Sequence, residues 1–483
     1  MPLLQASSPP VSHTILDSVF HRQSALFRGV FAVCVFSALA LIWAHRFLPI
    51  SDYPDWIYEG PIVTALLHGN APASYTFKHY PVPYAGIVAL LGLLDFAFPP
   101  EVSGKVALSL CVILLALSST YLLKSLRHDA DSPLLLIPLL FLFNTFFFMG
   151  ELAYVLGLSL FFFYCGYLFR RIHRSEPINW WFIGGASIAL FFCHFMPYAT
   201  AILVTLTLCL TESRIGLLRP FAISFAPSMG LTIWYAIERW FLKASGPVWE
   251  FWTVHQIAGR LLAAFCLFPE FLPWVGIHAP GMKAFALLNL VVAILLIFVV
   301  PLCVVFWAKG RAGNRGVLAC ALACAFAVIA TGYEFSGMLS PGERFIYPAV
   351  WIGLCWLIGA WIPREGSLAS RGLTVVLIGL LVCQILFLQI NVGAASNGLA
   401  ALYSKLRSAN SRTEFCAIYE TYVQQSWEKP HRTGVDLLLT NQPSAPRLPY
   451  YLYLEEKVEA PIFQIGILSY KGPGDNEDLC KSQ

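Results

Sequence analysis

Residues 25–59 read ALFRGVFAVCVFSALALIWAHRFLPISDYPDWIYE, an apolar run followed by a short segment that carries three carboxylates. An apolar run of about 20 residues is what an α-helix needs to cross a bilayer. No small-residue cleavage site follows the run, so we expect a retained first transmembrane helix. Ionisable groups directly beyond such a helix need a chemical reason, which makes Asp52, Asp55 and Glu59 the first candidate functional residues.

The composition of the whole chain agrees with a membrane protein. Its 483 residues are 58% hydrophobic and only 12% charged, with a mean hydropathy of +0.68, which is far too apolar for a soluble protein. We therefore expect an all-α polytopic membrane protein. The net charge is only +4, and the basic residues recur in short clusters between apolar runs. This pattern reports membrane orientation and excludes a nucleic-acid-binding surface.

Hydropathy predicts about 11 transmembrane helices. They cover approximately residues 25–45, 104–123, 134–149, 152–169, 180–195, 198–212, 219–237, 284–306, 317–335, 344–361 and 372–391. With the leader, residues 1–24, in the cytoplasm, the basic loops between these helices also fall on the cytoplasmic side, as the positive-inside rule requires. These loops contain Lys124 and Arg127, then Arg170, Arg171 and Arg174, then Arg214 and Arg219, then Lys309, Arg311 and Arg315, and finally Arg364 and Arg371.

Three longer segments are then expected on the non-cytoplasmic side. The first outer loop spans residues 46–103, and within it the short apolar segment Tyr84–Phe98 is expected to lie along the membrane interface. The second spans about 238–283, and the third is the C-terminal stretch 392–483. Only this last stretch has a soluble composition, so we expect it to form a small outward-facing α/β appendage beside the transmembrane domain 25–391.

The 13 cysteines give little support for a metal centre. Most stand singly in apolar segments, where Cys behaves as a small hydrophobe. Cys320 and Cys324 share a helix face, but no further ligands are spaced to complete a zinc site. Cys416 and Cys480 lie in the outer stretch, where an oxidising compartment would allow a disulfide. The sequence leaves open whether these two residues lie close enough to pair.

Polar residues gather at the predicted outer ends of the helices. The cytoplasmic loops offer basic residues and no Gly-rich phosphate-binding loop, so we expect any chemistry on the outer face. The candidates beyond the first-loop carboxylates are Lys78, His79, Glu151, His194, Glu238, Arg239, Glu334, Glu343 and Arg344.

Each candidate also has a purely structural interpretation. A carboxylate just outside a helix end is commonly a solvated cap, and this applies to Glu151 as much as to the first-loop acids. His194 at the end of an apolar helix could be a satisfied core histidine. Arg344 could extend to the lipid headgroups without any other role. The case for a functional site rests on the occurrence of all these groups at one membrane face.

The order of these features resembles the GT-C superfamily of integral membrane glycosyltransferases, which includes the protein O-mannosyltransferases and the aminoarabinose transferases. The shared features are an outward-running first helix, an acid directly after it, a long outer loop, a basic residue before Tyr80-Pro-Val-Pro-Tyr84, and the sequence Arg344-Phe-Ile-Tyr-Pro348 opening a late helix. The resemblance covers roughly residues 25–390. It departs at Tyr53, where the family often has a second acid, and at the interrupted Pro-Val-Pro pair.

The resemblance implies an enzyme that moves a sugar from a polyprenyl-phosphate donor to an acceptor hydroxyl of a lipid, glycan or protein, with inversion. Asp52, with Asp55 as the alternative, would accept the proton of that hydroxyl. Lys78 or His79 matches the family's basic residue near the lipid phosphate, and Arg344 matches its late arginine. We also expect substrate contacts from the carboxylates and the histidine at the outer helix ends, Glu59, Glu151 and His194.

Other interpretations stay open at this point. No cofactor is required, but Asp52 with Asp55 or Glu151 could hold a divalent cation. A transporter or flippase of lipid-linked sugars would use charges at the bilayer midplane and repeated halves, and the sequence has neither. A non-catalytic membrane assembly subunit is a third possibility. The compact loops favour the bacterial inner membrane, with the N-terminus in the cytoplasm and the C-terminus in the periplasm.

Overall fold

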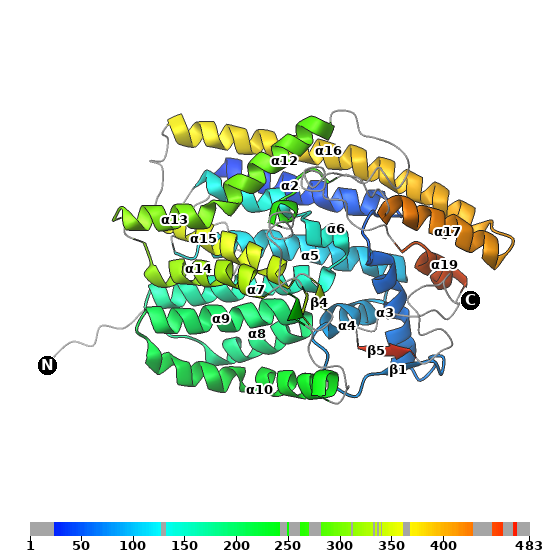
Figure 1. Ribbon diagram of the computed structural model, residues 1–483, viewed down its shortest axis with the longest axis horizontal. Helices are drawn as coiled ribbons and strands as arrows, with labels where there is room; N and C mark the ends of the chain where they lie inside the picture. The colour runs from blue at the N-terminus through cyan, green and yellow to red at the C-terminus, as the bar shows by residue number, and fades with distance from the viewer. Residues whose placement is uncertain are drawn as a thin grey trace.

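The protein is mainly α-helical, with a few very short strands (Figure 1). The computed structural model describes residues 24–126, 132–241, 249–250, 261–269, 282–310, 313–331, 334–335, 338–339, 341–360, 368–427, 447–456 and 467–470. Within these ranges, 6 helical segments are long and apolar enough to cross a membrane. The chain is therefore an all-α, multi-pass membrane protein, as the sequence predicts. These segments are α2 (Ala25–Ala44), α5 (Pro100–Leu123), α7 (Leu152–His173), Ile215–Arg239 around α10 (Leu218–Ala236), Leu287–Ala308, and α16 (Leu368–Arg407).

Shorter elements complete the bundle and its connections. The α-helices are α3 (Tyr53–Leu67), α4 (Ala85–Leu94), α6 (Thr145–Met149), α8 (Trp180–Cys193), α9 (Phe195–Thr211), α12 (Met282–Ile297), α13 (Val299–Ala308), α14 (Arg315–Ala330), α15 (Ile346–Ala360), α17 (Arg412–Trp427) and α19 (Pro449–Glu456). Tighter 3-10 turns are η1 (Pro133–Phe141), η2 (Ile215–Leu217) and η5 (Gly342–Phe345), and η3 (Ile237–Phe241) is a π turn. The strands are β1 (Tyr75–Phe77), β2 (Trp249–Glu250), β3 (Glu334–Phe335), β4 (Met338–Leu339) and β5 (Leu468–Tyr470).

Polar caps start several of the apolar helices. The side chains of Asn144, Asn179 and Asn314 accept hydrogen bonds from backbone N–H groups at the first turns of α6, α8 and α14. Such caps satisfy donors that have no partner inside the helix. The caps explain why these helices begin where they do, in a sequence with few other polar groups.

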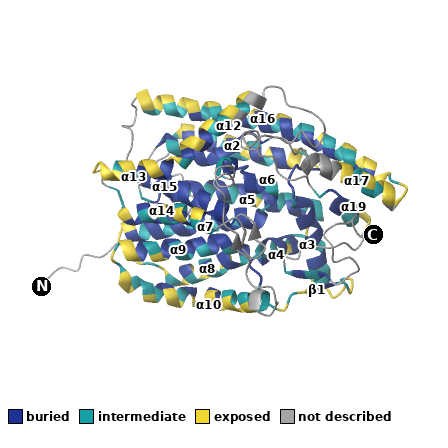
Figure 2. Cartoon of the chain, in the orientation of Figure 1, coloured by how far each residue is buried: buried dark blue, intermediate teal, exposed yellow. Residues whose placement is uncertain are grey.

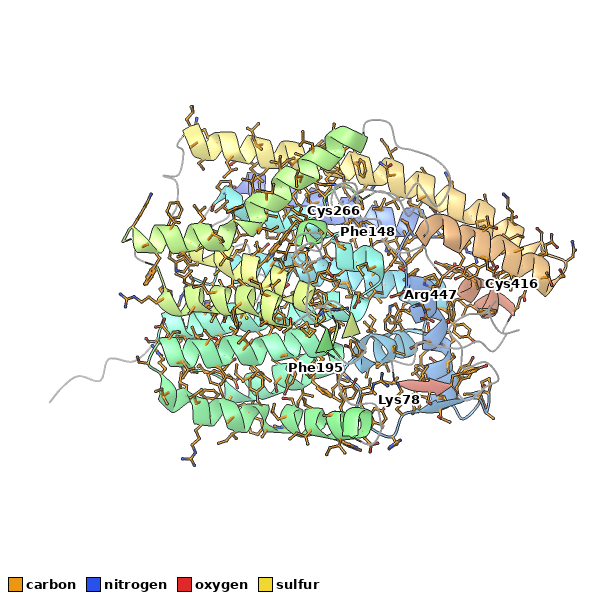
Figure 3. The ribbon with its side chains drawn as sticks, in the orientation of Figure 1. Lys78, Phe148, Phe195, Cys266, Cys416 and Arg447 are labelled. Atoms are coloured by element: carbon orange, nitrogen blue, oxygen red, sulfur yellow. The ribbon has the colours of Figure 1, made fainter. Side chains whose placement is uncertain are left out.

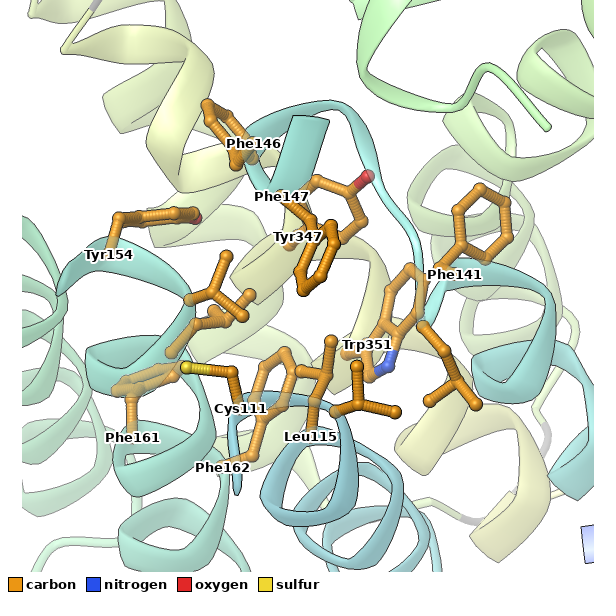
Figure 4. Close-up of a cluster of buried hydrophobic side chains, with 14 of the residues drawn as sticks. Cys111, Leu115, Phe141, Phe146, Phe147, Tyr154, Phe161, Phe162, Tyr347 and Trp351 are labelled. Atoms are coloured by element: carbon orange, nitrogen blue, oxygen red, sulfur yellow. The ribbon is translucent and has the colours of Figure 1, made fainter. Parts of the chain in front are cut away.

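The core lies between α5, α7 and α15, and the outer helices α10, α12, α13 and α16 have exposed apolar side chains (Figure 2). Phe141, Phe162, Tyr347 and Trp351 meet in an aromatic cluster at the centre (Figure 4). The exposed outer residues are large and apolar, as on α16, where Ile390 is 70% exposed. An apolar outer surface of this extent suits contact with lipid.

Two predicted spans are broken. The predicted span 134–149 is not one α-helix: it consists of η1, with Pro138 inside it, followed by α6. Proline removes a backbone donor and fixes φ, which favours this tighter and interrupted path. The predicted span 284–306 is divided into α12 and α13, which meet at Phe298.

The two ends of the bundle differ in character. At one end, the basic loops come together: the Arg214 guanidinium reaches the carbonyl of Ile172 at 3.5 Å, and Glu212 accepts the Gly316 N–H at 2.9 Å. At the other end lie α3, α4, β1 and β5, together with α17 and α19 (Figure 1). The basic loops and the candidate site residues therefore occupy opposite ends.

Two elements of the C-terminal stretch, β5 and α19, pack on the first outer loop. β5 pairs antiparallel with β1, with Tyr470 opposite Tyr75, and α19 lies against α3. The predicted domain boundary at residue 391 falls inside α16, which continues unbroken to Arg407. Cys416 is disulfide-bonded; Cys480, whose pairing with Cys416 the sequence leaves open, lies outside the described residues.

Candidate functional site

The first-loop carboxylates share one face of α3. Asp52 is the residue that precedes the helix, and Asp55 and Glu59 follow at spacings of three and four residues, which places them on the same side. The Asp52 side chain is 24% exposed, whereas Asp55 and Glu59 are buried. Pro54 suits the first turn of the helix because its missing N–H would have no partner there.

Arg447 pairs with two of these carboxylates. Its Nη1 lies 3.4 Å from Asp55 Oδ2, and its Nε lies 3.7 Å from Asp52 Oδ1. The backbone N–H of Arg447 donates to the carbonyl of Ser51 at 3.1 Å, so the main chain is fixed beside the start of α3. Figure 3 labels Arg447 in this position, between α3 and α19. This arginine is not among the site residues that the sequence predicts.

A second ion pair forms around Glu151, which precedes α7. Its carboxylate accepts a hydrogen bond from the Arg344 guanidinium on η5, and its other oxygen lies 3.9 Å from His194 Nε2. Arg344 and His194 are both buried. The Arg344 carbonyl accepts the Tyr154 hydroxyl at 2.7 Å, which fixes the backbone of η5 against α7.

His194 has a defined orientation between α8 and α9. Its Nδ1 accepts the backbone N–H of Met196 at 3.0 Å, so this nitrogen carries no proton. The ring is then neutral, with its proton on Nε2, the nitrogen that faces Glu151. Tyr84 packs edge-on against the ring, with the centroids 4.6 Å apart. His194 is therefore both a helix cap and a donor directed toward the Glu151 carboxylate.

The turn between α6 and α7 joins the two ion pairs. The Ser51 N–H donates to the Phe148 carbonyl at 2.9 Å, and the Trp56 indole N–H donates to the Gly150 carbonyl at 2.8 Å. Gly150 has φ +83, and a Cβ there would lie 2.5 Å from the backbone nitrogen of Asp52. Glycine is needed both for this conformation and for the close approach. The turn thus brings Glu151 near Asp52.

Burial and neighbouring charges shift the pKa values of the Asp52 and Asp55 carboxyl groups. Burial raises the pKa of Asp52 to about 6; Arg447 opposes this rise, and Glu151 adds to it. Burial likewise raises the pKa of Asp55, again against Arg447 and with a contribution from Asp52. A carboxylate with a pKa near neutral is suited to accept and release a proton.

The predicted basic residues of the first loop, Lys78 and His79, directly follow β1 (Tyr75–Phe77). His79 is exposed, and its Nε2 lies 3.2 Å from Glu238 Oε2 on the π turn η3. The Lys78 N–H donates to the Ile467 carbonyl at 2.9 Å, beside the β1–β5 pair (Figure 3). Arg447 and Arg344 pair with Asp52, Asp55 and Glu151, and the phosphate-binding role predicted for Lys78 or His79 stays a prediction.

The carboxylates do not fit a metal site. In the ranges that the structure describes, no three His, Cys, Asp or Glu side chains lie close enough together to hold an ion. Asp52 and Asp55 face one guanidinium, and Glu151 faces another. One oxygen of each of these carboxylates therefore faces a cationic guanidinium, which competes with a divalent cation for the same ligands. We derive no chemical step through a metal.

Comparison with known proteins gives no relative: no protein-family model, no curated protein and no solved structure matches the chain. The interpretation of the site therefore depends on its chemistry. It offers a partly exposed carboxylate of raised pKa, Asp52, paired with Arg447, and near it a second carboxylate, Glu151, paired with Arg344, at one end of an apolar helical bundle.

Proposed function

We propose that this protein is a membrane glycosyltransferase of the GT-C kind, which transfers a sugar from a polyprenyl-phosphate donor to an acceptor hydroxyl. One observation carries the proposal: Asp52 and Asp55, paired with Arg447, lie next to Glu151, paired with Arg344, at one end of the bundle. Sugar transfer from a lipid phosphate needs a proton acceptor and a cation at the level of the headgroups. This end of the molecule offers both.

In the proposed mechanism, Asp52 takes the proton of the acceptor hydroxyl. The hydroxyl oxygen forms a bond to the anomeric carbon, while the bond from that carbon to the donor phosphate oxygen breaks. The phosphate leaves with the electron pair and is neutralised by an arginine, for which Arg344 is our choice. A single displacement of this kind inverts the anomeric centre. Asp52 is preferred over Asp55 as the base because it is 24% exposed and Asp55 is 1% exposed.

We further propose that all of the about 11 predicted spans cross the membrane, with the site on the non-cytoplasmic face of a bacterial inner membrane. Each predicted span contains helical structure in its described residues, and the basic loops lie at the end opposite the site. The charged residues of the long helices lie near their ends, as in α16, where the chain between Arg371 and Lys405 carries none. This supports transfer at the surface over transport through the midplane.

The proposal is tested with purified protein in lipid vesicles and a panel of polyprenyl-phosphate sugars, following transfer to an acceptor or release of the sugar. Asp52→Asn removes the proton acceptor and is expected to lower turnover by about 10² or more, with a smaller loss for Asp55→Asn. Glu176→Gln is the control, because Glu176 is a half-buried carboxylate paired with Arg171 at the opposite end. Equal turnover in the wild type and in both aspartate variants would remove the assignment.

A further inference from the structure

The C-terminal stretch reaches the first-loop site from far along the chain. Its strand β5 pairs with β1, the Tyr450 ring of α19 packs against Tyr58 of α3 at 5.3 Å, and the Arg447 N–H donates to the Ser51 carbonyl at 3.1 Å. The last of these bonds is made to the residue directly before Asp52. The backbone that carries the guanidinium is therefore fixed relative to the carboxylates that it faces.

Arg447 stands among several groups that carry or can acquire negative charge. Asp52 and Asp55 approach it from α3, Tyr450 from α19, and Tyr419 from α17; Glu151 acts on Asp52 from the α6–α7 turn. Glu59 lies further along α3 and acts on Tyr450. Arg447 is the cation that opposes the effect of burial on both Asp52 and Asp55. A buried carboxylate that loses its cation becomes protonated, because an uncompensated buried charge is costly.

We propose that Arg447 is a positioning residue of this site, which holds the Asp52 carboxylate ionised and orients the side chains of both Asp52 and Asp55, so that the C-terminal stretch completes the active site. The part of the inference that concerns the reaction rests on the proposed function. The part that concerns the charge of the carboxylates rests on the ion-pair geometry alone. The planar guanidinium directs separate N–H groups at two carboxylates. A lysine in its place would supply a single point charge, so Arg447→Lys should restore only part of the effect.

The charge of the carboxylates can be measured without any substrate. Dicyclohexylcarbodiimide reacts with protonated carboxyl groups in apolar surroundings, and mass spectrometry locates the labelled residue. We expect Arg447→Gln to raise labelling of Asp52 at pH 7 by up to about tenfold over the wild type, and Arg447→Lys to give an intermediate value. Arg407→Gln is the matched control: Arg407 pairs with Glu455 at 3.7 Å in the same region and should leave the labelling unchanged.

Equal labelling of Asp52 in the wild type and Arg447→Gln would overturn the inference. The variants are first compared with the wild type for monodispersity and thermal unfolding. If Arg447→Gln does not purify as a folded protein, the comparison is made with Arg447→Lys, and unchanged labelling in that variant also overturns the inference.

The vesicle assay separates this inference from the proposed function. In an active enzyme, Arg447→Gln should lower kcat by about tenfold or more, leave KM nearly unchanged, and move the acid limb of the rate–pH profile to higher pH, because the base then keeps its proton longer. Altered labelling in a protein that transfers no sugar supports the role of Arg447 while the proposed function fails. Full activity and an unchanged pH profile in Arg447→Gln overturn the role of Arg447 and leave the proposed function standing.

Discussion

At the scale of single residues, Asp52 and Asp55 differ in exposure although both face Arg447. Asp52 precedes α3 and retains 24% of its side-chain surface, whereas Asp55 lies one turn inside and retains 1%. A carboxylate that must meet an acceptor hydroxyl has to be reachable. Asp52 can therefore serve as the base, and Asp55 can support it through the shared guanidinium.

The pH dependence of the proposed sugar transfer follows from the position of Asp52. Its pKa is raised to about 6 by burial, with Glu151 adding to the rise and Arg447 opposing it. A base works only after losing its proton, so the rate should rise with pH through about 6 and fall about tenfold per unit below that value. Glu151→Gln removes a neighbouring negative charge and should move this midpoint to lower pH. A rate–pH profile measures the shift; a midpoint that stays in place or rises in Glu151→Gln would contradict this electrostatic picture.

At the scale of elements, the turn from α6 to α7 fixes the start of α3. Gly150 adopts φ +83, and its carbonyl accepts the Trp56 indole N–H at 2.8 Å. The turn also carries Glu151, so one short connection places both a carboxylate and the backbone of Asp52. Displacement of this turn should therefore disturb both ion pairs of the site together.

Gly150→Ala tests this coupling, with Gly69→Ala as its control. Both glycines have positive φ, which costs an alanine roughly 1–2 kcal/mol. Only at Gly150 would the added Cβ also meet Asp52, at 2.5 Å from its nitrogen; around Gly69 nothing lies within 4 Å. In both variants we expect a similar, small loss of thermal stability from the positive φ of the alanine. Gly150→Ala alone should lose further stability and also about tenfold or more of the turnover. Equal turnover in the two variants would show that the turn does not position Asp52.

The elements also show what the sequence could and could not predict. Apolar length predicts where the helices lie, and positive charge predicts which loops come together, because both are local properties. Glu151, His194 and Arg344 were predicted as members of one site and do meet. Arg447 was missed because its partner Asp55 lies 392 residues away and no local pattern marks the pairing. The break at Pro138 was signalled by the proline itself, although apolar length alone indicated one continuous helix.

At the scale of the whole molecule, the separation of the two ends gives the site its setting. At the basic end, Arg214 donates to the Ile172 carbonyl and Glu212 accepts the Gly316 N–H. The ion pairs of Asp52 and Glu151 lie at the other end. Between these two ends the described helices are apolar, so the length of the helices separates the two polar ends. Positive charge at one end predicts that this end faces the cytoplasm.

The orientation can be measured with single introduced cysteines. Asn70 is exposed just after α3 at the site end, and Gly216 is exposed in η2 at the basic end. In intact cells, a membrane-impermeant maleimide should label Asn70→Cys directly and Gly216→Cys only after the membrane is permeabilised. The protein without an introduced cysteine is the control for labelling of the native cysteines. Among the described residues, all but one of the free cysteines are buried. The reverse pattern would place Asp52 and its arginines in the cytoplasm, where a periplasmic sugar transfer could not occur, and the proposed function would have to be abandoned.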